Sequence, residues 1–303
     1  MRLLIFGGTG MLGQSLVKAA RARGHAALAL SHAQADLEDA GRLLYWAETF
    51  RPEAVINCAA YTKVDLAEGE GREKAFAVNG SAVRNVVAAA AALNARLLHV
   101  STDYVFDGKA REPYGEDAPT HPMSVYGQSK LAGEQEALAY EKALVVRTSW
   151  LFGPGGPNFV TTMVRLIQEG KLPLKVVHDQ EGCPTYTPYL AEALLDLASL
   201  GAPLGLTGVV HYRNRERASW CDFAEEIARL WSGTAEVVPV TTKEFPRPAP
   251  RPAYSVLDVS RFEAAAGRRV ETWETGLAEY VSGMRRRFAV GRSVEIRKGE
   301  TRR

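Results

Sequence analysis

A phenol and an ammonium group are spaced four residues apart in the segment Tyr126-Gly-Gln-Ser-Lys130. Residues four apart lie on one face of a helix, so the two side chains are expected to be neighbours. A free phenol has a pKa of about 10, and a nearby cation lowers that pKa by favouring the phenolate. The spacing therefore predicts that Lys130 lets Tyr126 exchange a proton near neutral pH.

Thr102 supplies a third polar group, directly after an apolar run from Leu97 to Val100 that is expected to form a strand. Ligands bind at the carboxyl ends of parallel strands. A hydroxyl there would hydrogen-bond a substrate carbonyl oxygen while Tyr126 protonates it and a nicotinamide delivers hydride to the carbon. The alternative is that Ser101 and Thr102 only cap the turn. We interpret Thr102, Tyr126 and Lys130 as the catalytic residues of a nicotinamide-dependent oxidoreductase.

A glycine-rich turn near the N-terminus has the spacing Gly8-x-Gly10-x-x-Gly13, and Gly7 adds the variant G-x-x-G-x-x-G. It directly follows the apolar run Leu3 to Phe6. Such a turn needs residues without a Cβ, both for its tight geometry and for close approach of the backbone to a pyrophosphate. The amides at the start of the next helix then face the phosphates. The position at the first strand–helix junction predicts dinucleotide binding rather than an ordinary glycine turn.

The end of the second expected strand indicates which nicotinamide cofactor fits. An acidic residue there would bind both ribose hydroxyls and repel a 2′-phosphate. Ser31 and His32 follow Leu30 instead, so NADPH is permitted. NADH remains open, because no arginine is present there to bind the extra phosphate. His32 is either a hydrogen-bond partner or a solvated loop residue, and Asp36 and Leu37 are expected near the adenine.

Short apolar runs alternate with segments of helical period along the first half of the chain. The expected strands are Arg2 to Phe6, Ala26 to Leu30, Ala54 to Asn57, Leu97 to Val100 and Leu144 to Arg147. The expected helices are Met11 to Ala22, Ala40 to Thr49, Glu73 to Leu93 and Val125 to Tyr140. This βαβ repetition predicts an α/β fold with a Rossmann-type, doubly wound parallel sheet, whose strands are buried on both faces.

The alternation ends after the fifth expected strand, where glycines and prolines interrupt the chain. We therefore predict a dinucleotide-binding domain over residues 1–150 and a smaller C-terminal lobe, mainly substrate-binding, over 151–284. Segments near 176–212 could return to the first domain. Phe245 to Pro252 contains four prolines and is expected to be an extended strap over a site. Residues 285–303 form a basic tail that is expected to be frayed and solvated.

The composition excludes several classes of protein. The chain has 303 residues, 46% of them hydrophobic, and a formal net charge of +2, too small for a nucleic-acid footprint over the whole chain. Cys58, Cys183 and Cys221 form no CxxC pair, so neither a disulfide framework nor a zinc site is expected. Three cysteines without such pairing are typical of a protein in a reducing cytoplasm. Neither a signal peptide nor an unbroken apolar span is evident, so we expect a soluble protein that is not inserted in a membrane.

Seven segments, in order, resemble the extended short-chain dehydrogenase/reductase superfamily and, within it, the dTDP-4-dehydrorhamnose reductase family. They are GGTGMLG, NCAAYTKVDLAE, STDYVFDG, YGQSKLAGE, RTSWLFGPGGPNF, DQEGCPT and RPAYSVLD. The resemblance implies reduction of the 4-keto group of dTDP-4-dehydro-L-rhamnose to dTDP-L-rhamnose, with Thr102, Tyr126 and Lys130 in the catalytic roles. The residues expected to bind the cofactor are Gly7, Gly10, Met11, Leu12, Gly13, Ser31, Asp36, Leu37, Ala59, Ala60, Tyr61, Tyr126 and Lys130.

Residue 104 distinguishes this sequence from related dehydratases. Sugar-nucleotide dehydratases of the superfamily carry Thr-Asp-Glu, in which the Asp and Glu serve as acid and base, whereas this chain has Thr102-Asp103-Tyr104. Dehydration is therefore disfavoured. The resemblance implies that Asp103, Tyr104 and Trp150 line the sugar pocket, where the aromatic rings would stack on the sugar. Ordinary burial of Trp150 in the core is the alternative.

Two positions depart from a pattern found in some members of the family, which share a magnesium ion between subunits through acidic residues. Those residues lie just after the glycine loop and just after the Pro-Thr of DQEGCPT. Ser15 and Pro188 occupy the positions here, and neither offers a carboxylate to a hard cation. We therefore predict activity without a divalent metal and argue against a metal-bridged dimer. The oligomeric state itself is left open.

Two other functions are open on the sequence alone. Some proteins of the family bind the dinucleotide yet act as regulatory subunits of methionine adenosyltransferase, although the intact set of Thr102, Tyr126 and Lys130 favours catalysis. An enzyme of this type could also reduce or epimerise a related nucleotide sugar. The product stereochemistry depends on which face of the sugar meets the nicotinamide, and no motif reports that.

Overall fold

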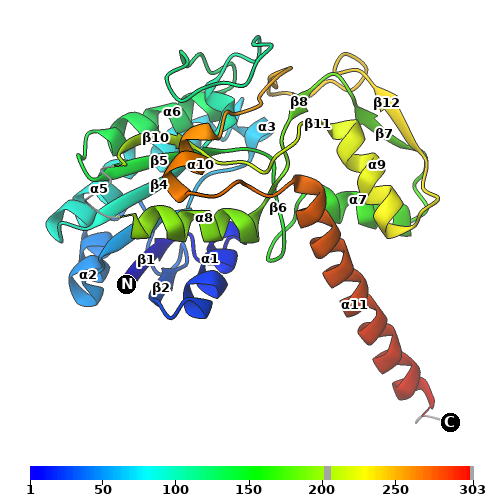
Figure 1. Ribbon diagram of the computed structural model, residues 1–303, viewed down its shortest axis with the longest axis horizontal. Helices are drawn as coiled ribbons and strands as arrows, with labels where there is room; N and C mark the ends of the chain where they lie inside the picture. Colours follow the sequence, from blue (N-terminus) through cyan, green and yellow to red (C-terminus); the bar gives the residue numbers. More distant parts are fainter. Residues whose placement is uncertain (201–205, 301–303) are drawn as a thin grey trace.

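A six-stranded, fully parallel sheet forms the centre of the molecule (Figure 1). The computed structural model describes residues 1–200 and 206–300, with side chains up to Phe288. The strand order is β10-β5-β4-β3-β1-β2. Their bounds are β1 Arg2–Phe6, β2 Ala26–Leu30, β3 Ala54–Asn57, β4 Arg96–Thr102, β5 Ala143–Thr148 and β10 Gly208–His211. The expected doubly wound α/β sheet is confirmed.

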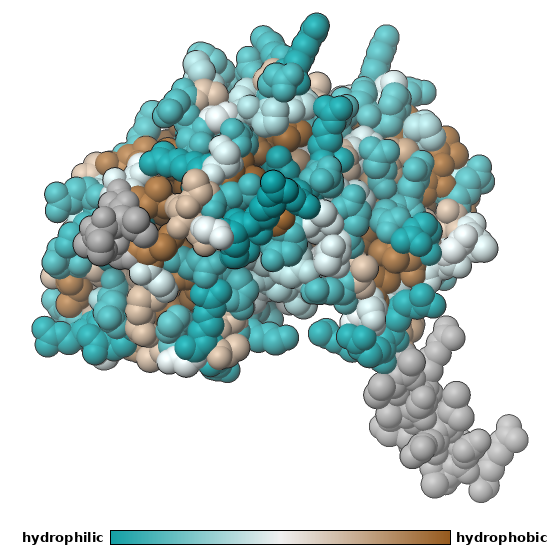
Figure 2. Space-filling model, in the orientation of Figure 1, coloured by the Kyte–Doolittle hydropathy of each residue, from teal (hydrophilic) through white to brown (hydrophobic). Residues whose placement is uncertain are grey.

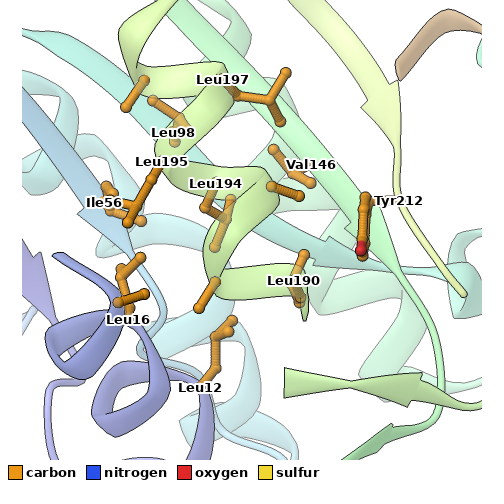
Figure 3. Packing of buried hydrophobic residues seen from close by; sticks show 14 of the residues in the cluster. Leu12, Leu16, Ile56, Leu98, Val146, Leu190, Leu194, Leu195, Leu197 and Tyr212 are labelled. Atoms are coloured by element: carbon orange, nitrogen blue, oxygen red, sulfur yellow. The ribbon is translucent and has the colours of Figure 1, made fainter. Parts of the chain in front are cut away.

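Helices cover both faces of the sheet, and the strands alternate their apolar side chains between the two layers. In β1, Leu3 and Ile5 join one core cluster, whereas Leu4 and Phe6 join the other. The first cluster is closed by α1 and α8, whose leucines interdigitate over the sheet in Figure 3. The helices of the two layers are α1 Met11–Ala22, α8 Thr187–Ser199 and α10 Ser260–Ala266 on one face, and α2 Ala40–Phe50, α5 Val83–Ala92 and α6 Val125–Leu138 on the other.

A smaller lobe, on the right in Figure 1, packs around its own aromatic core. Phe152, Phe223 and Trp273 are buried in this core. The chain enters the lobe after β5, returns to the sheet through α8 and β10, and then enters the lobe again. Its elements are β6 Leu151–Phe152, α7 Phe159–Gln168, β7 Leu174–Val177, β8 Glu181–Gly182, β9 Thr185–Tyr186, β11 Ala218–Ser219, α9 Trp220–Trp231, β12 Val237–Val240 and α11 Trp273–Glu300.

Four segments differ from the sequence-based expectation. The helix expected over Glu73 to Leu93 is divided by a π-helical turn, giving α4 Arg72–Phe76, η1 Ala77–Ser81 and α5. The short elements α3 Val64–Ala67 and η2 Asp103–Val105 were not expected. The basic segment from residue 285 continues α11 as far as Glu300, because Arg, Glu and Lys are good helix formers. Residues 301–303 of the expected tail lie outside the described residues.

The visible surface is mainly hydrophilic (Figure 2), as expected where the apolar side chains fill the two sheet layers and the lobe. The domain boundaries drawn from the sequence stay a prediction. Within the described part of the chain, none of the helices is both long and apolar enough to cross a bilayer.

Candidate active site

A cavity of about 880 Å³ lies at the carboxyl ends of β1, β3, β4 and β5 and reaches the second lobe. This volume is within the range of small-molecule sites. The structure brings nearly all of the expected site residues to it. They are Gly7, Gly10, Met11, Leu12, Gly13, Asp36, Leu37, Ala59, Ala60, Tyr61, Thr102, Asp103, Tyr104, Tyr126, Lys130 and Trp150. Their individual roles stay predictions.

The glycine loop closes on itself before α1 begins. Gly7 has φ +79, and the amide of Gly10 donates to Gly7 O at 3.0 Å. A Cβ at Gly13 would collide with Gly7 O, and a Cβ at Gly7 would lie 2.6 Å from Ala59 N. Only bare backbone therefore fits here, and it leaves the start of α1 facing the cavity. These residues fit a dinucleotide pyrophosphate, as the sequence predicted.

Ser31 is the expected cofactor residue that does not line this cavity. Its hydroxyl donates to Gln34 Oε1 at 2.9 Å, and the same oxygen accepts from the Ser31 amide at 3.0 Å. His32 lines the cavity instead, and its Nε2 lies 3.7 Å from Asp36 Oδ2. Ser31 is therefore hydrogen-bonded within its own turn next to the cavity, and its role in cofactor binding stays a prediction.

Tyr126 is placed by the capped start of α6. The hydroxyl of Ser124 accepts from the Gly127 amide at 3.1 Å, which begins the helix just before Tyr126. A Cβ at Gly127 would collide with Tyr104 O, so glycine lets α6 pack directly against the turn that follows β4. The rings of Tyr104 and Tyr126 meet edge to face, with centroids 5.7 Å apart. The proposed proton donor therefore lies beside the end of β4.

Thr102 caps the turn and lines the cavity at the same time. Its Oγ1 donates to Asp103 Oδ1 at 3.0 Å and accepts from the Tyr104 amide at 3.2 Å. The strand extends through Thr102 rather than stopping at Val100. The capping interpretation and the catalytic interpretation are thus geometrically compatible. Because the hydroxyl has one proton, it must turn away from Asp103 to donate to a substrate oxygen.

Burial controls the titration of the two key side chains. It raises the pKa of Tyr126 to about 12, with a further rise from the negative charge of Asp103, while the Thr102 hydroxyl opposes the shift. Burial lowers the pKa of Lys130 to about 8, against the opposing effects of Glu134 and Cys58. The Lys130 ammonium donates to Val100 O at 2.7 Å. The expectation that Lys130 brings the Tyr126 pKa towards neutrality does not hold in this arrangement, and Tyr126 is a neutral phenol able to donate a proton.

These shifts predict how the reductive reaction depends on pH. Below about 8, Lys130 is a cation and can stabilise the negative charge that develops on a carbonyl oxygen; above that pH it becomes neutral. Tyr126 stays protonated up to a pH of about 12. We therefore expect kcat/KM to fall as the pH rises through the pKa of Lys130. A kcat/KM that stays constant or increases into the alkaline range would contradict this assignment, and the melting temperature over the same range controls for unfolding.

Glu134 supports the site from one helical turn beyond Lys130. It is 1% exposed, and its carboxylate accepts from Arg147 Nη2 at 2.7 Å and from the Ser101 hydroxyl at 2.5 Å. This network joins α6 to β4 and β5, the elements that carry the catalytic candidates. Glu134 and Arg147 were not among the expected site residues, because nothing in their spacing shows that they meet.

Asn79 is a second supporting residue that was not among the expected site residues. In the π-helical turn η1, its Oδ1 accepts from the Tyr61 amide at 2.7 Å and its Nδ2 donates to Ser129 Oγ at 3.0 Å. It therefore joins the Tyr61 loop to the middle of the Tyr126–Lys130 segment. The π-helical turn shifts the direction of the side chains that follow it. This turn, which places Asn79, is seen only in the structure.

Aromatic side chains form the end of the cavity that lies in the second lobe. Trp150, Trp220, Phe159 and Phe223 all line it. Trp150 is half-buried, which argues against the alternative that it is a plain core residue. Trp220 was not among the expected site residues, because it follows Trp150 by many positions and belongs to a different element.

Comparison with known proteins agrees with this geometry. Residues 1–286 match the family described as the RmlD substrate binding domain. A dTDP-4-dehydrorhamnose reductase of Streptomyces griseus is 42% identical over 282 residues, covering 92% of each chain. The chain belongs to the dTDP-4-dehydrorhamnose reductase family. Among solved structures, the family member from Clostridium acetobutylicum has a TM-score of 0.87 at 39% identity, covering 94% of this chain and 100% of that one.

A further family member, from Bacillus anthracis, was solved in complex with NADP. It superposes with a TM-score of 0.86 at 36% identity and covers 92% of this chain and 98% of its own. The glycine loop, the sheet order and the position of Tyr126 at the start of α6 are thus found in a chain whose family includes a dinucleotide complex. The fold and the family expected from the sequence are confirmed.

Neither of the two positions expected to hold carboxylates for a shared metal ion carries one in this chain. Ser15 Oγ donates to Thr187 Oγ1 at 3.0 Å between α1 and α8, and Pro188 follows in the first turn of α8. Across residues 1–200 and 206–288, no group of three or more Asp, Glu, His or Cys side chains is arranged to hold a metal ion. The expectation of metal-independent activity stays a prediction.

Proposed function

We propose that this chain reduces the 4-keto group of dTDP-4-dehydro-L-rhamnose with NADPH, yielding dTDP-L-rhamnose. The observation that carries the proposal is the meeting of Thr102, Tyr126 and Lys130 beside the glycine loop in one cavity. The names of the relatives described above support the same substrate. The chain is an oxidoreductase of its family, and those relatives offer no support for a regulatory subunit of methionine adenosyltransferase.

Different residues of the chain have different roles in carbonyl reduction. Bound NADPH supplies a hydride to the carbonyl carbon. Tyr126 holds the proton that passes to the carbonyl oxygen, and its raised pKa keeps that proton in place until negative charge develops. Thr102 can donate a hydrogen bond to the same oxygen. Cationic Lys130, which lines the same cavity, stabilises the negative charge that develops on this oxygen.

Asp103 is placed to keep Tyr126 in its acid form. It is buried, and burial raises its pKa to about 6, while the Thr102 hydroxyl is among the groups that oppose this rise. At neutral pH it is largely ionised, and its negative charge disfavours phenolate at Tyr126. The Asp103 carboxylate therefore helps to keep Tyr126 protonated until a substrate oxygen accepts the proton.

The experiment that tests the proposal follows the loss of NADPH absorbance with purified protein and dTDP-4-dehydro-L-rhamnose. Turnover, with dTDP-L-rhamnose identified by NMR as the product, is the expected result. Tight NADPH binding without turnover would instead favour a non-enzymatic role. Formation of a product with different hydroxyl stereochemistry would favour a related nucleotide sugar. The same assay with NADH measures the cofactor preference that Ser31 and His32 leave open.

Metal independence is a separate prediction. Excess chelator is expected to leave kcat within about twofold of its original value, because neutral Ser15 and Pro188 stand where a hard cation would need carboxylates. Loss of activity that magnesium restores would contradict it. Measurement of the oligomeric state with and without chelator also tests whether any dimer depends on a metal.

A further inference from the structure

A loop between β6 and α7 reaches across to the glycine loop. It spans residues 153–158, and we call it the covering loop. Gly155 and Gly156 line the same cavity as Gly10 and Met11 at the start of α1. A Cβ built on Gly156 would lie 3.5 Å from the Met11 Cβ, so the gap between the two segments admits a methyl group and nothing as large as a phosphate. The covering loop therefore lies beside the amides expected to bind the pyrophosphate.

The side chain of Gln14 joins the covering loop to the glycine loop. Its Nε2 donates to Gly155 O at 2.8 Å and to Thr9 O at 2.7 Å, so both hydrogens of the amide are used. Gln14 is an exposed residue of α1, whereas Gly155 belongs to the chain that has entered the second lobe. We call the hydrogen bond between Gln14 and Gly155 the Gln14 bridge.

The backbone of Gly155 is adapted to this bridge. Gly155 has φ +97, a conformation that favours glycine. A Cβ built on it would lie 2.8 Å from Gln14 Oε1, closer than such atoms normally approach. The bridge therefore depends on bare backbone on one side and on an amide donor on the other.

Asn158 braces the covering loop from within. Its Nδ2 lies 2.9 Å from Gly153 O and 3.1 Å from Gly156 O, and its Oδ1 accepts from the Thr161 amide at 3.1 Å to cap α7. The same Nδ2 lies 3.6 Å from Met11 Sδ, which is only a weak acceptor. The covering loop is therefore expected to move as one piece with the start of α7.

We propose that the covering loop is part of the cofactor site and that the Gln14 bridge controls how fast the dinucleotide enters and leaves. This role rests on the proposed use of NADPH and is independent of the sugar. Widening the gap between Met11 and Gly156 requires the Gln14 bridge to break. Because the bridge joins protein groups only, it has the same energy with and without the cofactor, so its loss should change both rates and leave Kd nearly constant.

Gln14→Met tests the bridge, because methionine has a similar length and no N–H to donate. Stopped-flow mixing with NADPH gives the association rate from energy transfer out of Trp150 and Trp220, which line the cavity. A chase with excess NADP⁺ gives the dissociation rate. Both rate constants are expected to rise about 3- to 10-fold, the effect of losing one neutral hydrogen bond. The Kd of NADPH should stay within about twofold of the wild-type value.

Gln135→Met is the matched control, since Gln135 is exposed on α6 and lies outside the cavity. It should leave both rates unchanged. Gly155→Ala tests the bridge from the other side, because its methyl group would collide with Gln14 and strain the backbone. It should also raise both rates, and adding Gln14→Met to it should produce no further increase. Circular dichroism establishes that each variant is folded.

The outcomes separate the Gln14 bridge from the proposed function. Unchanged rates in Gln14→Met would overturn the bridge. A faster dissociation alone, with Kd rising in proportion, would also overturn it, because Gln14 would then contact the cofactor directly. Both of these results leave the reductase proposal intact. Failure of the wild-type chain to bind NADPH would instead overturn the proposed function itself.

Discussion

Replacing Tyr126 with phenylalanine is expected to lower kcat by about 10²- to 10⁴-fold, the usual contribution of a positioned general acid. The phenyl ring keeps its edge-to-face contact with Tyr104, so the cavity keeps its shape. The hydroxyl acts on the substrate only as the carbonyl accepts hydride, so kcat and kcat/KM should fall together. Steady-state kinetics with NADPH and the keto sugar measure both values.

Tyr45→Phe is the control for this substitution, since Tyr45 is 55% exposed on α2 and lies outside the cavity. It should leave kcat unchanged. The Kd of NADPH is expected to change by less than about threefold in Tyr126→Phe, because the glycine loop supplies the phosphate contacts. Turnover by Tyr126→Phe within tenfold of the wild-type rate would remove Tyr126 from the role of proton donor.

Replacing Glu134 with alanine is expected to lower the free energy of unfolding by about 3–5 kcal/mol, the cost of leaving one charge of a buried pair without its partner. The Arg147 side chain is 5% exposed, and Glu134 is its anionic partner. The guanidinium then keeps a cation–π contact with Phe106 at 5.2 Å, which does not neutralise its charge. Urea unfolding followed by circular dichroism measures the change.

Two controls distinguish a buried charge from simple loss of volume. Glu136→Ala removes a pair from the same helix, but Arg84 is 69% exposed there, so the cost should be much smaller than for Glu134→Ala. The double variant Glu134→Leu/Arg147→Met removes both buried charges and should recover most of the stability lost in Glu134→Ala. If Glu134→Ala costs no more than Glu136→Ala, the buried network is not important for stability.

The strands, most helices and the cofactor loop could be predicted because their signals are local. An apolar run such as Leu3 to Phe6 carries its own secondary-structure preference, and the glycine spacing after it is a requirement of one turn. The Tyr126–Lys130 spacing likewise places two side chains on one helical face. These features depend on residues that are adjacent in the chain, and the structure agrees with each of them.

Other features could not be read locally, even where the residues themselves were noticed. Lys130 was expected to lower the pKa of Tyr126, but burial and Asp103 raise that pKa to about 12. A pKa depends on solvent exclusion and on charges from several elements, and neither quantity is visible in a four-residue spacing.

The sequence by itself therefore determined the fold class, the family, the dinucleotide loop and the identity of the candidate proton donor. Only the tertiary structure decided the state of that donor, the buried Glu134–Arg147 pair and the stack of Trp150 on Trp220. Each of these joins segments that are separated in the chain, and their energies come from desolvation and close packing. Such contributions exist only after the sheet, α6 and the second lobe have come together.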